Sequence, residues 1–239
     1  MKKVKKKAAL RMILQELNDA SPKPDQKKWD KIWSEEDEAP YFREYVRIDD
    51  SFYHLKGYER QIKEELIWDA IKSLITSDGE DLEIHEYGCG LGENLVFLKE
   101  FGINRLKGFD FSQMAAMKVR AKGIDAHVFD MEGAAFQPER NYNADQKIAL
   151  TVHSLEQLKN PRPFLEFLKR HYDKCVHIEP VYEFYDPLNI YDYLAMQWHK
   201  KKGYVEGLLE SIPGKIIYKG RSQICGLMHN AYSTIIWEC

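Results

Sequence analysis

The period at which apolar residues recur differs between regions of the chain, and each period predicts a different secondary structure. Between residues 58 and 74, apolar side chains recur every three or four positions, which predicts one amphipathic helix. Beyond residue 79, short apolar runs alternate with helical patterns, as in a parallel sheet with crossover helices. We expect strands near residues 82–87, 105–110, 126–129, 147–152 and 175–179, and helices near residues 93–100, 113–121, 163–171 and 188–201.

The two ends of the chain follow other patterns. Residues 215–224 and 231–238 are rich in β-branched and aromatic side chains, which predicts an antiparallel hairpin that closes the sheet. Residues 8–17 predict a short amphipathic helix, and the proline-broken stretch 18–50 predicts short helices and connections. We therefore predict an α/β fold with a mostly parallel seven-stranded sheet. An N-terminal helical extension would cover residues 1–75, and the sheet domain residues 76–239.

Composition and charge exclude several classes of protein. The chain has 239 residues, of which 44% are hydrophobic, so it can form one sizeable domain with an appendage. No apolar run approaches the ~18 residues of a membrane span, so we expect a soluble protein. The four cysteines form no C-x-x-C pair, which argues against a zinc knuckle or disulfide scaffold and favours the cytoplasm. We interpret the lysine-rich start as a solvated terminus rather than a nucleic-acid arm.

The most informative segment runs from Glu86 to Asn94 and reads Glu-Tyr-Gly-Cys-Gly-Leu-Gly-Glu-Asn. It lies between a predicted strand and a predicted helix, where glycines let the chain turn tightly and let a ligand approach the backbone. A dinucleotide fold has the spacing G-x-G-x-x-G, whereas these glycines are spaced G-x-G-x-G. Glu93 would also repel a pyrophosphate from the start of the helix. We therefore do not expect a dinucleotide.

Carboxylates also end the next two predicted strands. Asp110, which precedes Phe111 and Ser112, can accept hydrogen bonds from both hydroxyls of a ribose. Asp130 can accept a hydrogen bond from an adenine amino group, while Met131 packs against the base. Taken singly, such aspartates could cap helices and the glycines could form a structural turn. Their succession at consecutive strand ends favours one nucleoside-containing ligand.

Together these residues resemble the class I S-adenosylmethionine-dependent methyltransferases, over about residues 80–239. The resemblance implies a Rossmann-like three-layer sandwich, S-adenosylmethionine as cofactor, and an antiparallel terminal hairpin. It implies that Glu86 approaches the amino-acid end of the cofactor and that the glycine backbone lies under it. The residues expected to bind the cofactor are Glu86, Gly88, Cys89, Gly90, Gly92, Asn94, Asp110, Phe111, Ser112, Asp130, Met131 and Thr151.

A base should follow the fourth strand of the parallel series, because an oxygen or ammonium acceptor must lose a proton. His153 lies there and has a suitable ordinary pKa, so we expect it to be catalytic; a structural, hydrogen-bonded histidine is the alternative. The chain reads Thr-Val-His-Ser where enzymes that methylate amino groups of nucleic-acid bases have Asn/Asp-Pro-Pro-Tyr/Phe. This argues against amino groups of DNA bases as the target.

Tyrosines beside carboxylates follow the fifth strand and suit a small polar acceptor, such as a sugar or hydroxylated metabolite, so we expect an O-methyltransferase. The basic run at residues 199–202 could bind an anionic group of the acceptor, although a solvated helix end is the simpler interpretation. The residues expected to bind the acceptor are Ser154, Glu156, Glu179, Tyr182, Tyr185, Tyr191, Arg221 and His229.

Other interpretations stay open. His153, Glu156, His177 and Glu179 form an imperfect metal pattern, but Gln157 stands where a metal-assisted enzyme has histidine, and we expect no metal. Two alternatives to a small-molecule methyltransferase are an RNA methyltransferase that uses the lysine arm and a scaffold protein that binds the cofactor without transfer. The N-terminal segment with Trp29 and Trp33 packs against the sheet or forms a lid over the cofactor.

Overall fold

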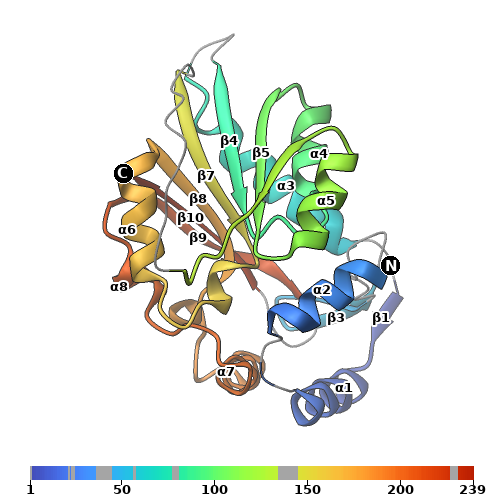
Figure 1. Ribbon diagram of the computed structural model, residues 1–239. Helices are drawn as coiled ribbons and strands as arrows, with labels where there is room; N and C mark the ends of the chain where they lie inside the picture. Colours follow the sequence, from blue (N-terminus) through green and yellow to red (C-terminus); the bar gives the residue numbers. More distant parts are fainter. Residues whose placement is uncertain are drawn as a thin grey trace.

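One mixed sheet organises the computed structural model, which describes residues 2–20, 22, 25–35, 45–55, 58–76, 81–133, 145–226 and 231–239 (Figure 1). The strands lie in the order β1-β3-β2-β9-β10-β8-β7-β4-β5-β6. The parallel strands are β4 (Leu82–Tyr87), β5 (Arg105–Asp110), β6 (Asp125–Val128), β7 (Gln146–Val152) and β8 (Lys174–Pro180). The antiparallel pair β9 (Lys215–Gly226) and β10 (Ala231–Glu238) continues the sheet beyond β8. The predicted seven-stranded arrangement is confirmed.

The N-terminal part adds three short strands to this sheet. They are β1 (Lys2–Val4), β2 (Tyr45–Ile48) and β3 (Ser51–His54), and β2 pairs antiparallel with β9, where Val46 lies opposite Gly226. The sequence pattern predicted only helices and connections before residue 50. Runs of three or four residues are too short to show a strand period, and β2 joins the main sheet by pairing with β9, at the far end of the chain.

Helices cover both faces of the sheet. On one face, α3 (Tyr58–Lys72), α4 (Glu93–Glu100) and α5 (Gln113–Ala121) bury apolar side chains such as Ile71, Leu98 and Val119. On the other face, α6 (Arg162–His171) and the short α8 (Leu208–Ser211) pack around Phe164 and Trp237. The result is the expected three-layer sandwich, with one apolar core on each side of the sheet (Figure 1).

The N-terminal helices attach to different parts of this sandwich. α1 (Lys6–Asp19) packs against α7 (Ile190–Lys202), with Ile13 and Trp198 in one apolar cluster. α2 (Gln26–Glu35) packs on α5 and on the loop after β4 through Trp33, Leu91 and Ala115. Figure 1 shows α2 beside the ends of the parallel strands. The division of the chain at residue 75 stays a prediction. Within the described ranges, no helix is long and apolar enough to cross a membrane.

Candidate functional site

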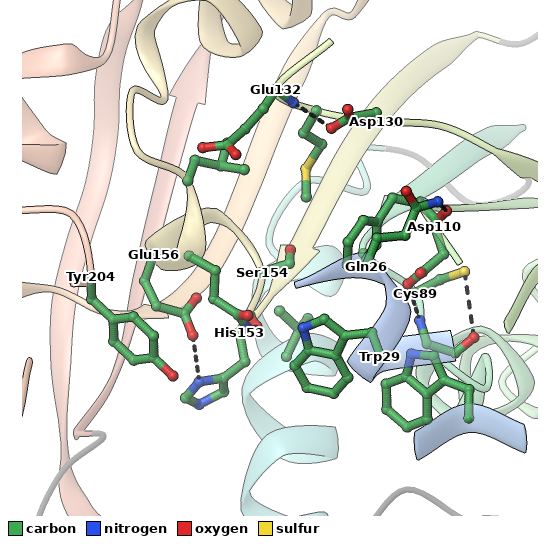
Figure 2. A pocket seen from close by; sticks show the side chains of 18 of the residues that line it. Gln26, Trp29, Cys89, Asp110, Asp130, Glu132, His153, Ser154, Glu156 and Tyr204 are labelled. Carbon is green, nitrogen blue, oxygen red and sulfur yellow. Dashed lines mark hydrogen bonds and ion pairs between the residues drawn. The ribbon is translucent and has the colours of Figure 1, made fainter. Parts of the chain in front are cut away.

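A cavity of about 800 Å³ lies at the carboxyl ends of the parallel strands. Its walls come from the segments that follow β4, β5, β6 and β7, together with α2 and the end of α7 (Figure 2). Parallel strands bring their carboxyl ends to one edge, so loops distant in sequence meet there. The predicted site residues that line the cavity are Gly88, Cys89, Gly90, Asn94, Asp110, Phe111, Asp130, Met131, His153, Ser154 and Glu156.

The glycine loop, residues 88–92, packs closely against the segments around it. The N–H of Gly88 donates 2.7 Å to the carbonyl of Phe109, and a β-carbon on Gly88 would lie 2.3 Å from that of Ser154. Gly90 has φ of 50° and faces Trp33, whose ring a β-carbon would approach to 3.2 Å. Gly92 does not line the cavity; it precedes α4 and packs against Val119 of α5.

Asp110 holds the loops after β4 and β5 together. Its Oδ2 accepts a 2.9 Å hydrogen bond from Gly90 N–H, and its Oδ1 accepts one of 2.9 Å from Ser112 N–H. Burial raises the pKa of Asp110 to about 6, and these two hydrogen bonds oppose the rise. Each carboxylate oxygen has a second lone pair, which matches the two hydroxyls of a ribose. Ser112 lies outside the cavity, because its hydroxyl caps α5 and donates to Asp30 of α2.

Glu86 is the penultimate residue of β4 and is fully buried. Asn94 Nδ2 donates a 2.5 Å hydrogen bond to its Oε1, while Glu86 Oε2 and Asn94 Oδ1 have no hydrogen-bond partner within the described part of the chain. Burial raises the pKa of Glu86 to about 8, against the lowering effects of Asn94 and of Lys63 from α3. Lys63 also lines the cavity. The sequence predicted its helix but gave no local sign that this lysine faces the site.

His153 follows β7 in a left-handed backbone conformation with φ of 53°. Its N–H donates 3.1 Å to the carbonyl of Ile178, and its carbonyl accepts 2.8 Å from Gln157 Nε2. Such a conformation costs about 1–2 kcal/mol and persists where the surroundings enforce it. The ring packs edge-on against Tyr232, and Nδ1 lies 3.4 Å from Oε1 of the buried Glu156. The loop thus presents a histidine–carboxylate pair to the cavity.

The end of α7 and the residues just after it form the wall of the cavity that faces His153 and Glu156. Lys202 Nζ lies 5.2 Å from the centre of the Trp198 ring, and Tyr204 packs edge-on against that ring at 5.4 Å. Figure 2 shows the Tyr204 hydroxyl pointing toward His153 and Glu156. The sequence singled out this aromatic stretch and basic run but not which members face the cavity. A second group comes from α2, where Gln26 and the stacked rings of Trp29 and Trp33 line the cavity. The sequence predicted that the two tryptophans either pack against the sheet or cover the cofactor, but it did not single out Gln26.

Several predicted acceptor contacts lie elsewhere. Arg221 pairs with the buried Asp192 at 2.5 Å, and Arg47 of β2 bonds to the same carboxylate at 2.8 Å. Tyr185 lies under the Arg221 guanidinium, and Tyr191 packs against Phe52 of β3. These contacts tie α7 to the sheet, and none of the three side chains lines the cavity. Tyr182 packs beside His199 and also lies outside the cavity. His229 falls outside the described residues.

Thr151 and Glu179 lie behind the cavity rather than in it. The hydroxyl of Thr151 is 2.8 Å from Nδ1 of His177. Glu179 is fully buried and accepts hydrogen bonds from the N–H groups of Ser154 and Leu155. Among the described residues, no three His, Cys, Asp or Glu side chains are arranged to hold a metal ion.

Comparisons with known proteins bear on this site. A family model described as "Methyltransferase domain" matches residues 58–231. Geranyl diphosphate C-methyltransferase from Streptomyces coelicolor A3(2) shares 14% identity and a TM-score of 0.56, with 92% of this chain and 99% of that chain covered. An S-adenosylmethionine-dependent methyltransferase from Mesorhizobium loti shares 15% identity and a TM-score of 0.51, with 73% and 98% covered. At such identities these likenesses show a shared fold. A comparison with curated proteins gives no match.

Proposed function

The chain belongs to the methyltransferase domain family and uses S-adenosylmethionine as its cofactor, and we propose that it methylates an oxygen atom of a small polar metabolite. One observation carries this proposal. The His153–Glu156 pair and the Tyr204 hydroxyl face one another on the left of Figure 2, whereas Asp110 and Cys89 lie on its right. A potential base therefore shares one cavity with the proposed ribose site without occupying it.

The residues present fit the cofactor. Asp110 would hold the ribose, and Asp130 and Met131 the adenine. The unpartnered oxygens of Glu86 and Asn94 can accept hydrogen bonds from a cationic amino group. When bound, the cofactor supplies a methyl group on a positively charged sulfur, which makes that carbon electrophilic.

His153 would accept the proton that the acceptor hydroxyl loses, and Glu156 would stabilise the resulting imidazolium. The strained backbone at His153, held by Ile178 and Gln157, fixes the ring relative to the cavity. Positioning of this kind and exclusion of water are the main contributions a protein can make to methyl transfer.

The α7 wall indicates the chemistry of the acceptor. The Trp198 and Tyr204 rings offer apolar surface, the Tyr204 hydroxyl offers a hydrogen bond, and Lys202 offers a positive charge. This combination suits a hydroxylated metabolite that also carries a carboxylate or a similar anionic group.

Labelled methyl donor tests the proposal. The protein is incubated with S-adenosylmethionine carrying a radioactive methyl group and, separately, with a metabolite extract filtered to low molecular mass, with total RNA, and with neither. Label should enter a low-mass product other than the donor, and hydriodic acid should release that label as methyl iodide, as it does from a methyl ether and not from a C-methyl group. Label in the RNA instead would favour the RNA-methyltransferase alternative. Cofactor binding without transfer to either fraction would favour a scaffold.

The role of His153 has its own variant. His153→Ala should lower turnover by about 10²–10⁴-fold, the usual contribution of a general base, with little change in cofactor affinity. His127→Ala is the matched control, because that histidine lies half-exposed on β6 beside Asp125. Equal turnover for the two variants would remove the catalytic role of His153.

A further inference from the structure

Two polar side chains of α2 bind the loop that follows β5. Gln26 Nε2 donates a 2.8 Å hydrogen bond to the carbonyl of Phe111. Oδ1 of Asp30 accepts a 2.5 Å hydrogen bond from the hydroxyl of Ser112, and the same hydroxyl caps α5. The helix α2 is therefore attached to the two residues that directly follow Asp110 in the chain.

An apolar contact attaches α2 to the loop that follows β4. Trp33 is buried and shares an apolar cluster with Leu91 of that loop and with Ala115 of α5. Its ring also lies next to Gly90, where a β-carbon would approach the ring to 3.2 Å. The two loops that α2 contacts are thus the loops that carry the glycine backbone and the carboxylate of the proposed ribose site.

The residues that α2 contacts also orient Asp110. Its carboxylate accepts one hydrogen bond from the N–H of Gly90 and one from the N–H of Ser112, each of 2.9 Å. Trp33 packs against the first of these residues, and Asp30 bonds to the second. Because each N–H group occupies one lone pair of a carboxylate oxygen, the two groups together decide in which direction the remaining lone pairs point. A displacement of α2 would therefore act on both donors that fix the carboxylate.

We infer that Asp30 is a positioning residue for the cofactor, because through Ser112 it holds the Asp110 carboxylate toward the ribose and couples the docking of α2 to cofactor binding. Asp30 itself does not line the cavity, whereas Gln26 and Trp29 of the same helix do. Coupling between two binding events is reciprocal, so a bound cofactor must also hold α2 in place. The inference rests on the assignment of Asp110 to the ribose in the proposed function, and it involves neither the methyl acceptor nor the proposed base.

Two substitutions of Asp30 separate its hydrogen bond from its charge. Asp30→Asn keeps an oxygen that can accept from the hydroxyl of Ser112, whereas Asp30→Ala removes the acceptor. In isothermal titration calorimetry, Asp30→Ala should weaken binding of S-adenosylhomocysteine by about 5–10-fold, at the low end of the usual coupling between sites. Asp30→Asn should bind like the wild type. Glu35→Ala is the matched control and should also bind normally, because that carboxylate is exposed on the same helix and pairs with Lys31.

The charge of Asp30 predicts the opposite result. Burial is the main cause that raises the pKa of Asp110, and the negative charge of Asp30 adds to the rise. If this charge were the main influence of Asp30, both variants would favour the ionised form of Asp110 and would bind the cofactor more tightly. Equal affinities in Asp30→Asn and Asp30→Ala, whatever the direction of change, would therefore overturn the inference.

Hydrogen exchange tests the reciprocal effect. In the wild-type protein, the amide hydrogens of α2 should exchange about 5–10-fold more slowly when S-adenosylhomocysteine is bound, and Asp30→Ala should reduce this protection. The helix α1, which packs against α7, is the reference and should show no change. Exchange in α2 that does not respond to the ligand would overturn the inference. Weakened binding in Asp110→Asn together with normal binding in Asp30→Ala would overturn the inference alone and leave the proposed ribose site in place.

Discussion

Asn94 donates a 2.5 Å hydrogen bond to one carboxylate oxygen of Glu86, and the other oxygen of Glu86 is buried with no partner in the described part of the chain. Burial raises the pKa of Glu86 to about 8, so this carboxyl group is protonated near neutral pH when no ligand is bound. A cationic amino group placed there would favour the ionised form. Lys63 supplies part of such a positive charge, because its charge lowers the pKa of Glu86.

Glu86 should make the ligand-free protein less stable as the pH rises. Its pKa is near 4.5 in the unfolded chain and about 8 in the folded protein, so its contribution is present below pH 4.5 and is lost as the pH rises through 8. Glu86→Gln should therefore gain stability relative to the wild type between these values, in urea unfolding at several pH values. Glu100→Gln, on the exposed end of α4, is the control and should show no such gain.

Asp110→Asn should weaken binding of S-adenosylhomocysteine by about 10–100-fold, the loss expected for charge-assisted hydrogen bonds. The variant loses the charge and places an amide against the N–H of Gly90 or Ser112. Isothermal titration calorimetry measures the affinity, and circular dichroism checks the fold. Asp125→Asn on the edge strand β6 should bind like the wild type. Unchanged affinity in Asp110→Asn would mean that the ribose lies elsewhere.

Gly90→Ala should both destabilise the protein and disturb α2. Its positive φ costs about 1–2 kcal/mol for any residue with a β-carbon. The new β-carbon would also lie 3.2 Å from the ring of Trp33. Gly102→Ala is the matched control, because Gly102 has φ of 91° and open space around it. Only Gly90→Ala should shift the tryptophan fluorescence and weaken cofactor binding. If the two variants behave alike, α2 does not contribute to cofactor binding.

Asp192→Asn should cost about 3–5 kcal/mol of stability, because it leaves the Arg47 and Arg221 guanidinium groups without their shared carboxylate. Burial tends to raise the pKa of Asp192, but the hydrogen bonds from Arg221 and Arg47 outweigh it and lower the pKa to about 2. The stabilisation is present above pH 3.8 and is lost as the pH falls toward 2. Denaturant unfolding against pH measures both effects, and a variant as stable as the wild type would contradict this role.

The sequence by itself determined the parallel sheet and which loops meet at its carboxyl edge. The period of the apolar residues reports local geometry, and the residues from Glu86 to Asn94 and those around Asp110 and Asp130 follow directly on strands. Strand ends in a parallel sheet share one edge by topology alone. For that reason the sequence predicts that Asp110 and Gly90 lie close together, and the hydrogen bond from Gly90 N–H to Asp110 confirms it.

Only the tertiary structure decided which side chains share the other half of the cavity. Tyr191 lies in the predicted aromatic stretch and Arg221 lies on β9, yet their side chains turn toward Phe52 and Asp192, while Lys202 and Tyr204 turn inward. Side chains on α7 are oriented by how α7 packs against α1 and β3, and β2 joins the main sheet by pairing with β9. Such contacts join residues more than a hundred positions apart, and no local period of apolar and polar residues encodes them.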